Sequence, residues 1–349
     1  MKNIRLTAVL AAGTFCCAFA LLLITCTNNK PTPKPDLVQA DTISPVPFPS
    51  NLGIAGFNFP EDSNKIYSWL NNNDVASIDN HAWGIWAGLT APSGEKYDGQ
   101  ELLVYETWLG ISELQAMVQA GNAEGGCTGI KTNRALLSFP NQLAHAAPAG
   151  ANRSLAVQPP DDNPGFWVSV AYDPNAACFA TKNRVFDAEV LRKKVQPDGG
   201  IGVIPPFPNT AITTKPTYFV GKVKDNLIRI PVWDSVPPPQ PYPNSIWNRY
   251  VYADVNNGQP AGKKLVPAKG DNPSKEAIAA ATCNLSDFIN FKIDSAAAAY
   301  INKQQNTQGI QADAGDLALL VAMHVATKEI SNWTWQTFYW APNPDNPLF

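Results

Sequence analysis

The strongest helical pattern of the chain lies between Ile78 and Leu89. Apolar side chains recur there at i, i+4, i+7, i+8 and i+11, a spacing that places them on one face of a helix. Pro92 and Gly94 follow this run, so we expect the helix to end before them. Four further helices are expected, at residues 112–118, after Asp173-Pro174, at 274–282 and at 294–305.

Strands are expected where branched and aromatic residues run together, at residues 101–108, 166–172, 218–223, 227–233, 247–255 and 288–293. Asp225-Asn226 is typical of a hairpin turn between two of these runs. The most strongly patterned part is C-terminal. Residues 317–328 and 333–340 indicate two adjacent antiparallel strands joined by a turn, although residues 317–325 alone also fit a buried helix.

Strands that alternate with helices without a regular βαβ order indicate an α+β fold. We expect a largely antiparallel mixed sheet with flanking helices, in a single compact body.

The first 25 residues have the features of an export signal. Lys2 and Arg5 supply a positive start, residues 6–25 carry no charge, and polar residues follow Cys26. Residues 23–26 (LITC) resemble the bacterial lipobox, in which the cysteine is acylated and becomes the mature N-terminus; Thr25 departs from the small residues of that pattern. Cys26 is therefore the expected lipidation site. An uncleaved anchor or an ordinary signal peptide are the alternatives, and all three readings export the body.

Residues 26–60 are expected to form a lipid anchor and a proline-rich linker. Seven prolines lie between Thr27 and Pro60, and proline favours an extended chain over a packed element. Residues 61–349 are expected to form one globular α+β domain. The expected location is the bacterial cell envelope, at the periplasmic face or the cell surface, with the N-terminal lipid as the contact to the membrane.

Composition excludes two classes of protein. Hydrophobic residues make up 45% of the 349 residues, which is too many for a largely disordered chain. The formal net charge is −3, so a protein held to nucleic acid by electrostatics is not expected.

Three of the six cysteines lie beyond the expected anchor, Cys127, Cys178 and Cys283. Three cysteines in an oxidising compartment allow at most one disulfide and leave a free thiol. Their spacing matches no zinc or haem-attachment motif, so we expect neither a metal nor a cofactor.

Three segments resemble a family of exported bacterial proteins of uncharacterised activity. They are His81–Thr90 (HAWGIWAGLT), Tyr105–Trp108 (YETW), and MHVATKEI with WTWQTFYW inside Met323–Trp340. The resemblance implies a shared fold and no particular reaction. Some members are fused to, or labelled alongside, cytochrome c domains, which implies an accessory role beside exported electron-transfer proteins; this chain has no haem-attachment motif.

The candidates for acid–base chemistry are Glu106, His324 and Lys328, whose side chains we expect to converge. On a strand, alternate side chains from Ala318 to Lys328 share one face. His324 then lies between small alanines, either as a hydrogen-bonded core residue or as a binding or general-base group. Glu106 lies in an apolar run, where a carboxylate has to be paired or protonated. Its expected partner is Lys328 or Arg249, and the functional alternative is a perturbed acid close to His324.

A binding site is expected among the aromatic residues, because flat rings stack on sugars and other flat ligands. For each candidate the alternative is packing in the core. Trp333 and Trp335 are two residues apart, so we expect them to share a strand face and to be largely buried. The candidates are Trp83, Trp86, Trp108, Trp333, Trp335 and His81.

The short motifs of serine hydrolases, zinc peptidases and nucleotide-binding enzymes are absent from the sequence. Glycosidases remain open, since they need only two carboxylates. Three functions therefore stay open: binding of a small ligand or an envelope protein through an aromatic cleft, hydrolysis by acidic and histidine side chains, and the accessory role. We favour binding. A deep pocket that holds Glu106, His324 and Lys328 together would instead indicate catalysis.

Overall fold

A computed structural model describes residues 42–97, 99–122, 127, 132–133, 164–194, 204–232, 248–304 and 311–343. These residues belong to one unit of the chain, residues 40–349. The expected signal peptide, Cys26 and the first part of the expected linker lie outside the described residues.

The larger sheet has six strands, and its order is β12-β13-β7-β5. β14 also pairs with β13, and β6 also pairs with β7. All of these pairings are antiparallel. The strands are β5 (Gly165–Val168), β6 (Ala171–Tyr172), β7 (Ile212–Gly221), β12 (Asn290–Lys292), β13 (Leu317–Thr327) and β14 (Thr334–Tyr339). The β13–β14 hairpin is the C-terminal strand pair that the sequence predicts.

A second sheet of four strands contains the one parallel pairing among the described strands, between β9 and β11. Its strands are β8 (Leu227–Val232), β9 (Arg249–Asp254), β10 (Ala268–Lys269) and β11 (Thr282–Asn284). Two short pairs complete the sheets: β1 (Thr42–Ile43) with β4 (Thr132–Asn133), and β2 (Pro92–Tyr97) with β3 (Gln100–Leu103). The fold is α+β with largely antiparallel sheets, as predicted.

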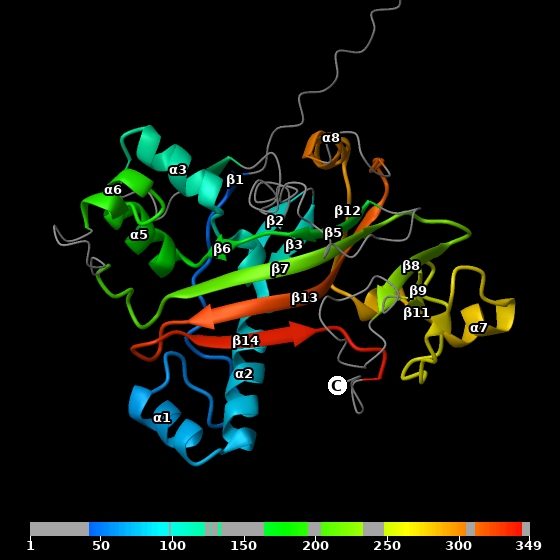
Figure 1. The fold of residues 1–349 in the computed structure, drawn as a ribbon, viewed down its shortest axis with the longest axis horizontal. Helices are drawn as coiled ribbons and strands as arrows, with labels where there is room; N and C mark the ends of the chain where they lie inside the picture. The colour runs from blue at the N-terminus through cyan, green and yellow to red at the C-terminus, as the bar shows by residue number, and fades with distance from the viewer. Residues whose placement is uncertain are drawn as a thin grey trace, which may run out of the picture. The chain divides into compact units, whose positions relative to one another are not determined.

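The helices flank the larger sheet (Figure 1). α3, α5 and α6 lie near one end of it, and α7 lies beside the second sheet at the other end (Figure 1). The described helices are α1 (Ser63–Asn71), α2 (Val75–Leu89), α3 (Ile111–Gln119), α5 (Pro174–Asn183), α6 (Ala188–Lys193), α7 (Lys275–Ala280) and α8 (Ser295–Gln304), with 3₁₀ turns η1 (Val104–Thr107) and η3 (Leu285–Asp287). Among the described residues, none of the helices is long and apolar enough to cross a membrane.

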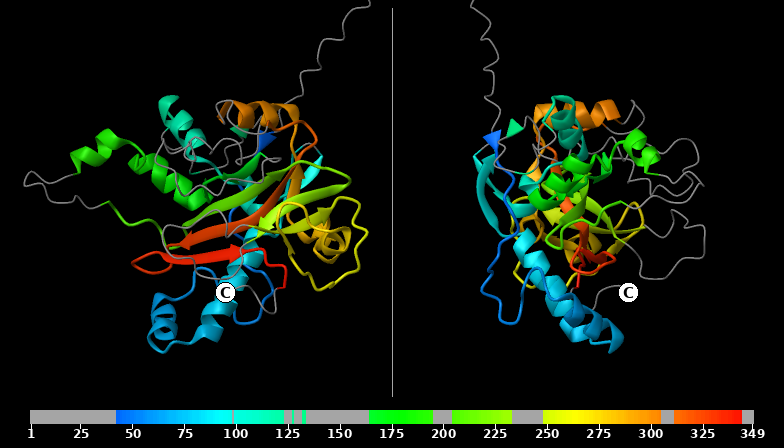
Figure 2. Two further views of the ribbon diagram at one scale, coloured as in Figure 1. Left: turned by 45° about the vertical axis from the view of Figure 1, so that its right-hand side comes forward. Right: turned by 90° about the vertical axis from the view of Figure 1, so that its left-hand side faces the viewer.

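α2 packs across one face of the larger sheet (Figures 1 and 2). Its stripe of apolar residues, which includes Ile85 and Leu89, belongs to the main core together with Met323 and Val325 of β13 and Phe338 of β14. The carboxylate of Asp74 caps the first turn by accepting the backbone N–H of Ser77. The helix predicted from the spacing is therefore present, and it begins at Val75.

Residues 42–60 were expected to be part of an extended linker, and the structure corrects this. Phe48, Phe57 and Phe59 pack against the main core. A Cβ atom at Gly84 would lie 2.1 Å from the ring of Phe57, and one at Gly88 would lie 2.2 Å from Phe48. The two glycines thus let these rings lie directly on α2. The apolar surface that the rings bury outweighs the extended preference of the prolines between them.

β13 contains a β-bulge at Val321. Leu320 pairs with Tyr218 of β7, but Ala322 pairs with the next residue, Thr217. The extra residue exchanges the two faces of the strand. Ala318 and Leu320 face the main core before the bulge, and Met323 and Val325 face it afterwards. Leu319 faces a second core, which the larger sheet shares with β8 and β9.

The prediction of a hairpin around Asp225-Asn226 is only partly correct. The two residues have positive φ angles of 53° and 62°, and Lys224 and Leu227 exchange both backbone hydrogen bonds across the turn. Beyond this bridge the strands separate, because β7 belongs to the larger sheet and β8 pairs with β9. The turn was predicted correctly, but the strands join different sheets.

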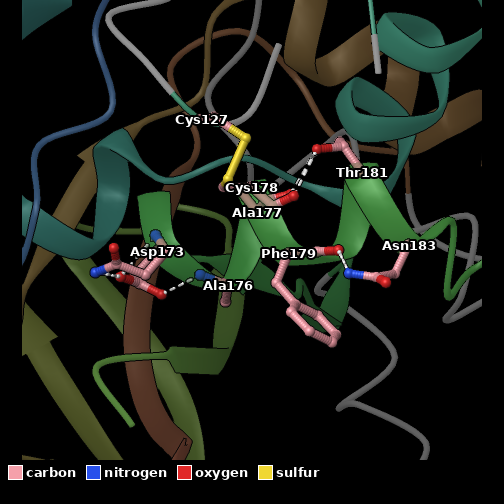
Figure 3. Close-up of a disulfide and its surroundings, with 9 residues drawn as sticks. Cys127, Asp173, Ala176, Ala177, Cys178, Phe179, Thr181 and Asn183 are labelled. Atoms are coloured by element: carbon pink, nitrogen blue, oxygen red, sulfur yellow. Dashed lines mark hydrogen bonds between the residues drawn. A yellow bond between two sulfur atoms is a disulfide. The ribbon is translucent and has the colours of Figure 1, made fainter. Parts of the chain in front are cut away.

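A disulfide links Cys127 to Cys178 on α5 (Figure 3). Cys283 is free and buried. One bridge and one free thiol is the arrangement that the cysteine count predicts. Asp173 caps α5, because its carboxylate accepts the backbone N–H groups of Asn175 and Ala176, as Figure 3 shows for Ala176. Burial raises the pKa of Asp173 to about 6, although these hydrogen bonds act in the opposite direction.

Candidate functional site

An aromatic groove lies between α2 and the β13–β14 hairpin. Its cavity volume is about 290 Å³. Asp287 and five small or aliphatic residues complete the walls, which are otherwise made of rings. The rings that line the groove belong to Trp83, Trp86, Phe288, Phe338, Tyr339 and Trp340.

The floor of the aromatic groove is held by ring contacts. The ring of Phe338 lies 4.8 Å from that of Trp86 and 5.4 Å from that of Trp83, measured between centroids. Trp340 stacks on Phe288 at 4.5 Å. Trp83 and Trp86 are three residues apart, so the helix places both on the side that meets β14. The floor is therefore fixed by packing before any ligand arrives.

The rim of the groove is exposed. Trp83 is 60% exposed and Tyr339 is 43% exposed, whereas Phe338 in the floor is 8% exposed. Large apolar side chains in contact with water at the edge of a concave aromatic surface are typical of ligand sites.

A second cavity, of about 450 Å³, shares Trp83 with the aromatic groove. His81 lines this cavity with Phe57 and Trp69, whose ring centroids lie 5.4 and 5.6 Å from the imidazole. Ser77, Asn80 and Lys65 add polar groups to the lining. The two cavities thus lie along α2 with an exposed tryptophan between them.

His81 is held by a buried carboxylate, that of Glu329. Nε2 of His81 lies 3.0 and 3.2 Å from the two oxygens of Glu329, whose side chain is 0% exposed. The same carboxylate accepts the backbone N–H of Glu61 at 2.8 Å and the hydroxyl of Thr327 at 2.6 Å. Because a carboxylate only accepts hydrogen bonds, Nε2 of His81 carries a proton and donates it to Glu329.

Glu61 adds a second carboxylate close to this pair. Its burial works against ionisation, but the ammonium of Lys65, 2.6 Å away, and the backbone N–H of Asp62 outweigh that effect and lower the pKa of Glu61. Sequence reasoning did not identify Glu329, because it lies 248 residues from His81 in a segment expected to be only a turn.

The other tryptophans predicted as binding residues, Trp108, Trp333 and Trp335, do not line the groove. Trp108 is fully buried, and its indole N–H donates to the carbonyl of Val46 at 2.7 Å, so it is a core residue. Trp333 is half-buried and contacts Phe207. The prediction that Trp335 is buried is wrong: it is 75% exposed. Residues of β14 alternate between faces, and it is Phe338, of the other parity, that faces the core.

Glu106, His324 and Lys328 were expected to converge, and the structure corrects this. His324 lies on the exposed face beyond the bulge, where its Nδ1 is 2.8 Å from the hydroxyl of Thr337. Lys328 is buried, but it donates to the carbonyls of Ile330 and Ser331 and forms no ion pair with Glu106. The bulge explains the position of His324, because it turns the residue away from the face that Leu320 occupies.

Glu106 was expected on a strand, but it lies in the 3₁₀ turn η1. Its carboxylate accepts the backbone N–H of Leu103 at 2.8 Å, which caps the turn. Burial raises the pKa of Glu106 to about 7, against the effect of that hydrogen bond and of Tyr105. The buried carboxyl group thus has hydrogen-bond partners, and its raised pKa favours the uncharged form.

Within the described parts of the chain, no three or more histidine, cysteine, aspartate and glutamate side chains gather as a metal site would require. Comparison with protein-family models, with curated proteins and with solved structures gives no match. The family resemblance of the segments around His81, Tyr105 and Met323 therefore stays a prediction. The structure does place two of those segments together, since Trp83 and Trp86 contact Phe338.

Proposed function

We propose that this protein binds a ring-shaped, uncharged ligand in the aromatic groove, and that this ligand is a saccharide. The observation that carries the proposal is the pair of exposed rings, Trp83 and Tyr339, above an aromatic floor. Leaving an indole 60% exposed has no benefit for folding, because its apolar surface stays in contact with water.

The chemistry of the walls favours a neutral ligand. Asp287 is the one acidic or basic residue among those that line the groove. A strongly charged ligand would find no group of opposite sign along most of this surface. A sugar ring presents apolar C–H faces that suit stacking and hydroxyl groups at its edge, which suit a groove with a polar margin.

The accompanying proposal is that the protein is exported and held to a bacterial membrane by lipid on Cys26. The Cys127–Cys178 disulfide supports export, because disulfides persist in oxidising compartments. A saccharide-binding protein in the envelope would meet its ligands there. No contact in the described residues specifically favours the accessory role in electron transfer.

The test is a comparison of two exposed tryptophans. Trp83→Ala removes one exposed ring from the rim of the groove. Trp335→Ala removes an indole that is 75% exposed and does not line the groove. Binding is measured by isothermal titration with three hexasaccharides, made of β-1,4-linked glucose, α-1,4-linked glucose and β-1,4-linked N-acetylglucosamine. We expect at least one to bind the natural protein and to bind Trp83→Ala at least about tenfold more weakly, or about 1.4 kcal/mol.

Trp335→Ala should bind as the natural protein does. Equal affinities of the natural protein and Trp83→Ala would place the ligand elsewhere on the surface. Failure of all three hexasaccharides to bind would overturn the assignment of a saccharide.

A further inference from the structure

A third cavity lies between the β2–β3 hairpin and the stretch from Phe288 through β12 to the start of α8. Its volume is about 350 Å³, and Phe288 and Phe291 supply aromatic walls. Three carboxyl side chains line it, those of Glu101, Glu106 and Asp294. Its size falls in the range of small-ligand sites. We refer to it as the Glu106 cavity.

Glu106 is the buried carboxyl group of this cavity. It is 9% exposed, and Oε2 is fixed by the backbone N–H of Leu103. Behind it lies Tyr105, whose hydroxyl is 2.8 Å from that of Tyr218. Burial, together with the neighbouring Glu106, raises the pKa values of both tyrosines well above their usual value. Glu106 with its pKa of about 7 is thus the group of this cluster that exchanges a proton near neutrality.

Asp294 is in a different environment. It is exposed, and Oδ1 accepts the backbone N–H of Ala297 at 2.6 Å, which holds the carboxylate at the start of α8. Oδ2 lies 3.5 Å from the hydroxyl of Tyr97, another residue of the cavity wall. One buried and one exposed carboxyl group in the same cavity is the arrangement that separates a proton donor from a base.

We infer that the Glu106 cavity hydrolyses glycosidic bonds, with Glu106 as the proton donor and Asp294 as the base that activates water. The substrate class rests on the proposed function. Phe288 and Ile289 line both this cavity and the aromatic groove. The two cavities therefore share part of one wall, and the proposal requires a saccharide held in the groove to extend along it.

The reaction consumes one water molecule. Glu106 gives its proton to the glycosidic oxygen as the bond between that oxygen and the anomeric carbon breaks, and the electron pair of the bond leaves with the oxygen. The oxygen of water bonds to the anomeric carbon, and its proton passes to Asp294. Proton exchange with solvent restores both carboxyl groups, and the products are two shorter saccharides.

Glu106→Gln is the informative variant. Glutamine has the shape of the uncharged acid and can accept the N–H of Leu103, but it has no proton to donate. We expect cleavage of the three hexasaccharides, followed by mass spectrometry, to fall at least about 100-fold in this variant. Its affinity for a hexasaccharide in the groove and its melting temperature should not fall. Asp294→Asn should lose cleavage to a similar extent.

Glu113→Gln is the matched control. Glu113 caps α3 just as Glu106 caps η1, since its carboxylate accepts the backbone N–H of Gly110 at 2.7 Å. It does not line the cavity, so this variant should cleave at the natural rate. A hexasaccharide that binds but stays intact would overturn the hydrolytic role and leave the proposed binding function standing. Cleavage that persists in Glu106→Gln would also overturn it. Absence of both binding and cleavage would overturn both proposals.

Discussion

Glu106 is a carboxyl group whose surroundings favour its uncharged form. It is 9% exposed, beside the hydroxyl of Tyr105, in a part of the main core that includes Val104. Moving a carboxylate into such surroundings costs more than the hydrogen bond from Leu103 returns, so burial raises the pKa to about 7 from an ordinary value of 4.5. The same property that suits proton donation therefore has a consequence for stability.

We expect the stability contribution of Glu106 to be lost as the pH rises. Below pH 4.5 the group is protonated in both the folded and the unfolded chain, and the contribution is fully present. Between pH 4.5 and about 7 only the unfolded chain releases the proton, so the free energy of unfolding falls. The shift corresponds to a loss on the order of 3 kcal/mol.

The measurement is urea unfolding at several pH values for the natural protein and for Glu106→Gln. Asp173, with its pKa of about 6, contributes a slope of the same sign to both proteins, so the difference between them isolates Glu106. The groups near Glu106 are Tyr105, Tyr218, Glu101, Lys292 and Asp294. Parallel curves for the two proteins between pH 4.5 and 7.5 would contradict the expectation.

The sequence singled out Glu106 as a residue that must be paired or protonated, because that follows from its apolar neighbours alone, but it did not identify the partners. It did not identify Glu329, which has the more extensive hydrogen bonds. Apolar neighbours in the sequence show that a charged residue needs a partner. They do not show which distant residue supplies that partner in the fold. His81 and Glu329 pair only because α2 packs under β13 and β14.

At the scale of elements, the Glu329 carboxylate joins three separate parts of the fold. It binds His81 on α2, the backbone N–H of Glu61 before α1, and Thr327 at the end of β13. If the carboxylate is removed, His81 Nε2 and the N–H of Glu61 lose this acceptor, whereas the hydroxyl of Thr327 still has Thr334 as a partner. The pair therefore fixes the position of α1 and α2 relative to the hairpin.

We predict that Glu329→Ala lowers the free energy of unfolding by about 3–5 kcal/mol, the cost of removing one partner of a buried pair. Glu329→Gln should cost less, because the amide oxygen still accepts two of these donors. Unfolding in urea measures both. Glu189→Ala, on an exposed position of α6, should leave the midpoint unchanged. A Glu329→Ala midpoint equal to that control would show that the three segments are held by packing alone.

Elements with strong periodicity were predicted well, as α2 and the β13–β14 hairpin show. The errors have local causes. The run 101–108 resembles a strand by composition, but the capping bond from Leu103 to Glu106 favours a 3₁₀ turn from Val104. In β14 the alternation was predicted correctly and the buried face was not, because periodicity shows that two faces differ but not which of them meets α2.

At the scale of the whole molecule, the location of the protein decides which ligands reach the aromatic groove. In the folded body, the Cys127–Cys178 disulfide supports export. Attachment to the membrane depends on Cys26. The anchor and the groove are separate proposals, since one concerns the first residues and the other the body. Each can fail without the other.

We predict that cells fed an alkyne-tagged fatty acid label the natural protein and do not label Cys26→Ser. The thioether that carries the lipid needs the sulfur of Cys26, and serine cannot form it. In-gel fluorescence after coupling to a dye measures the label. Cys283→Ser, which alters a buried thiol, should label normally. Labelling of Cys26→Ser at the natural level would exclude the lipobox reading.

The bulge at Val321 limits how this chain can vary during evolution. Leu319 and Met323 have the same parity, yet they face different cores, and only the extra residue between them allows this. An exchange of Val321 for another side chain alters one contact. A regular strand that kept all of these residues would turn Met323 and Val325 out of the main core and turn His324 into it. Deletion of Val321 would instead remove the extra residue and leave Ala322 opposite Thr217 and Met323 opposite Pro216, so both core residues would keep their face. Homologues that lack the bulge should therefore be one residue shorter at this point of β13.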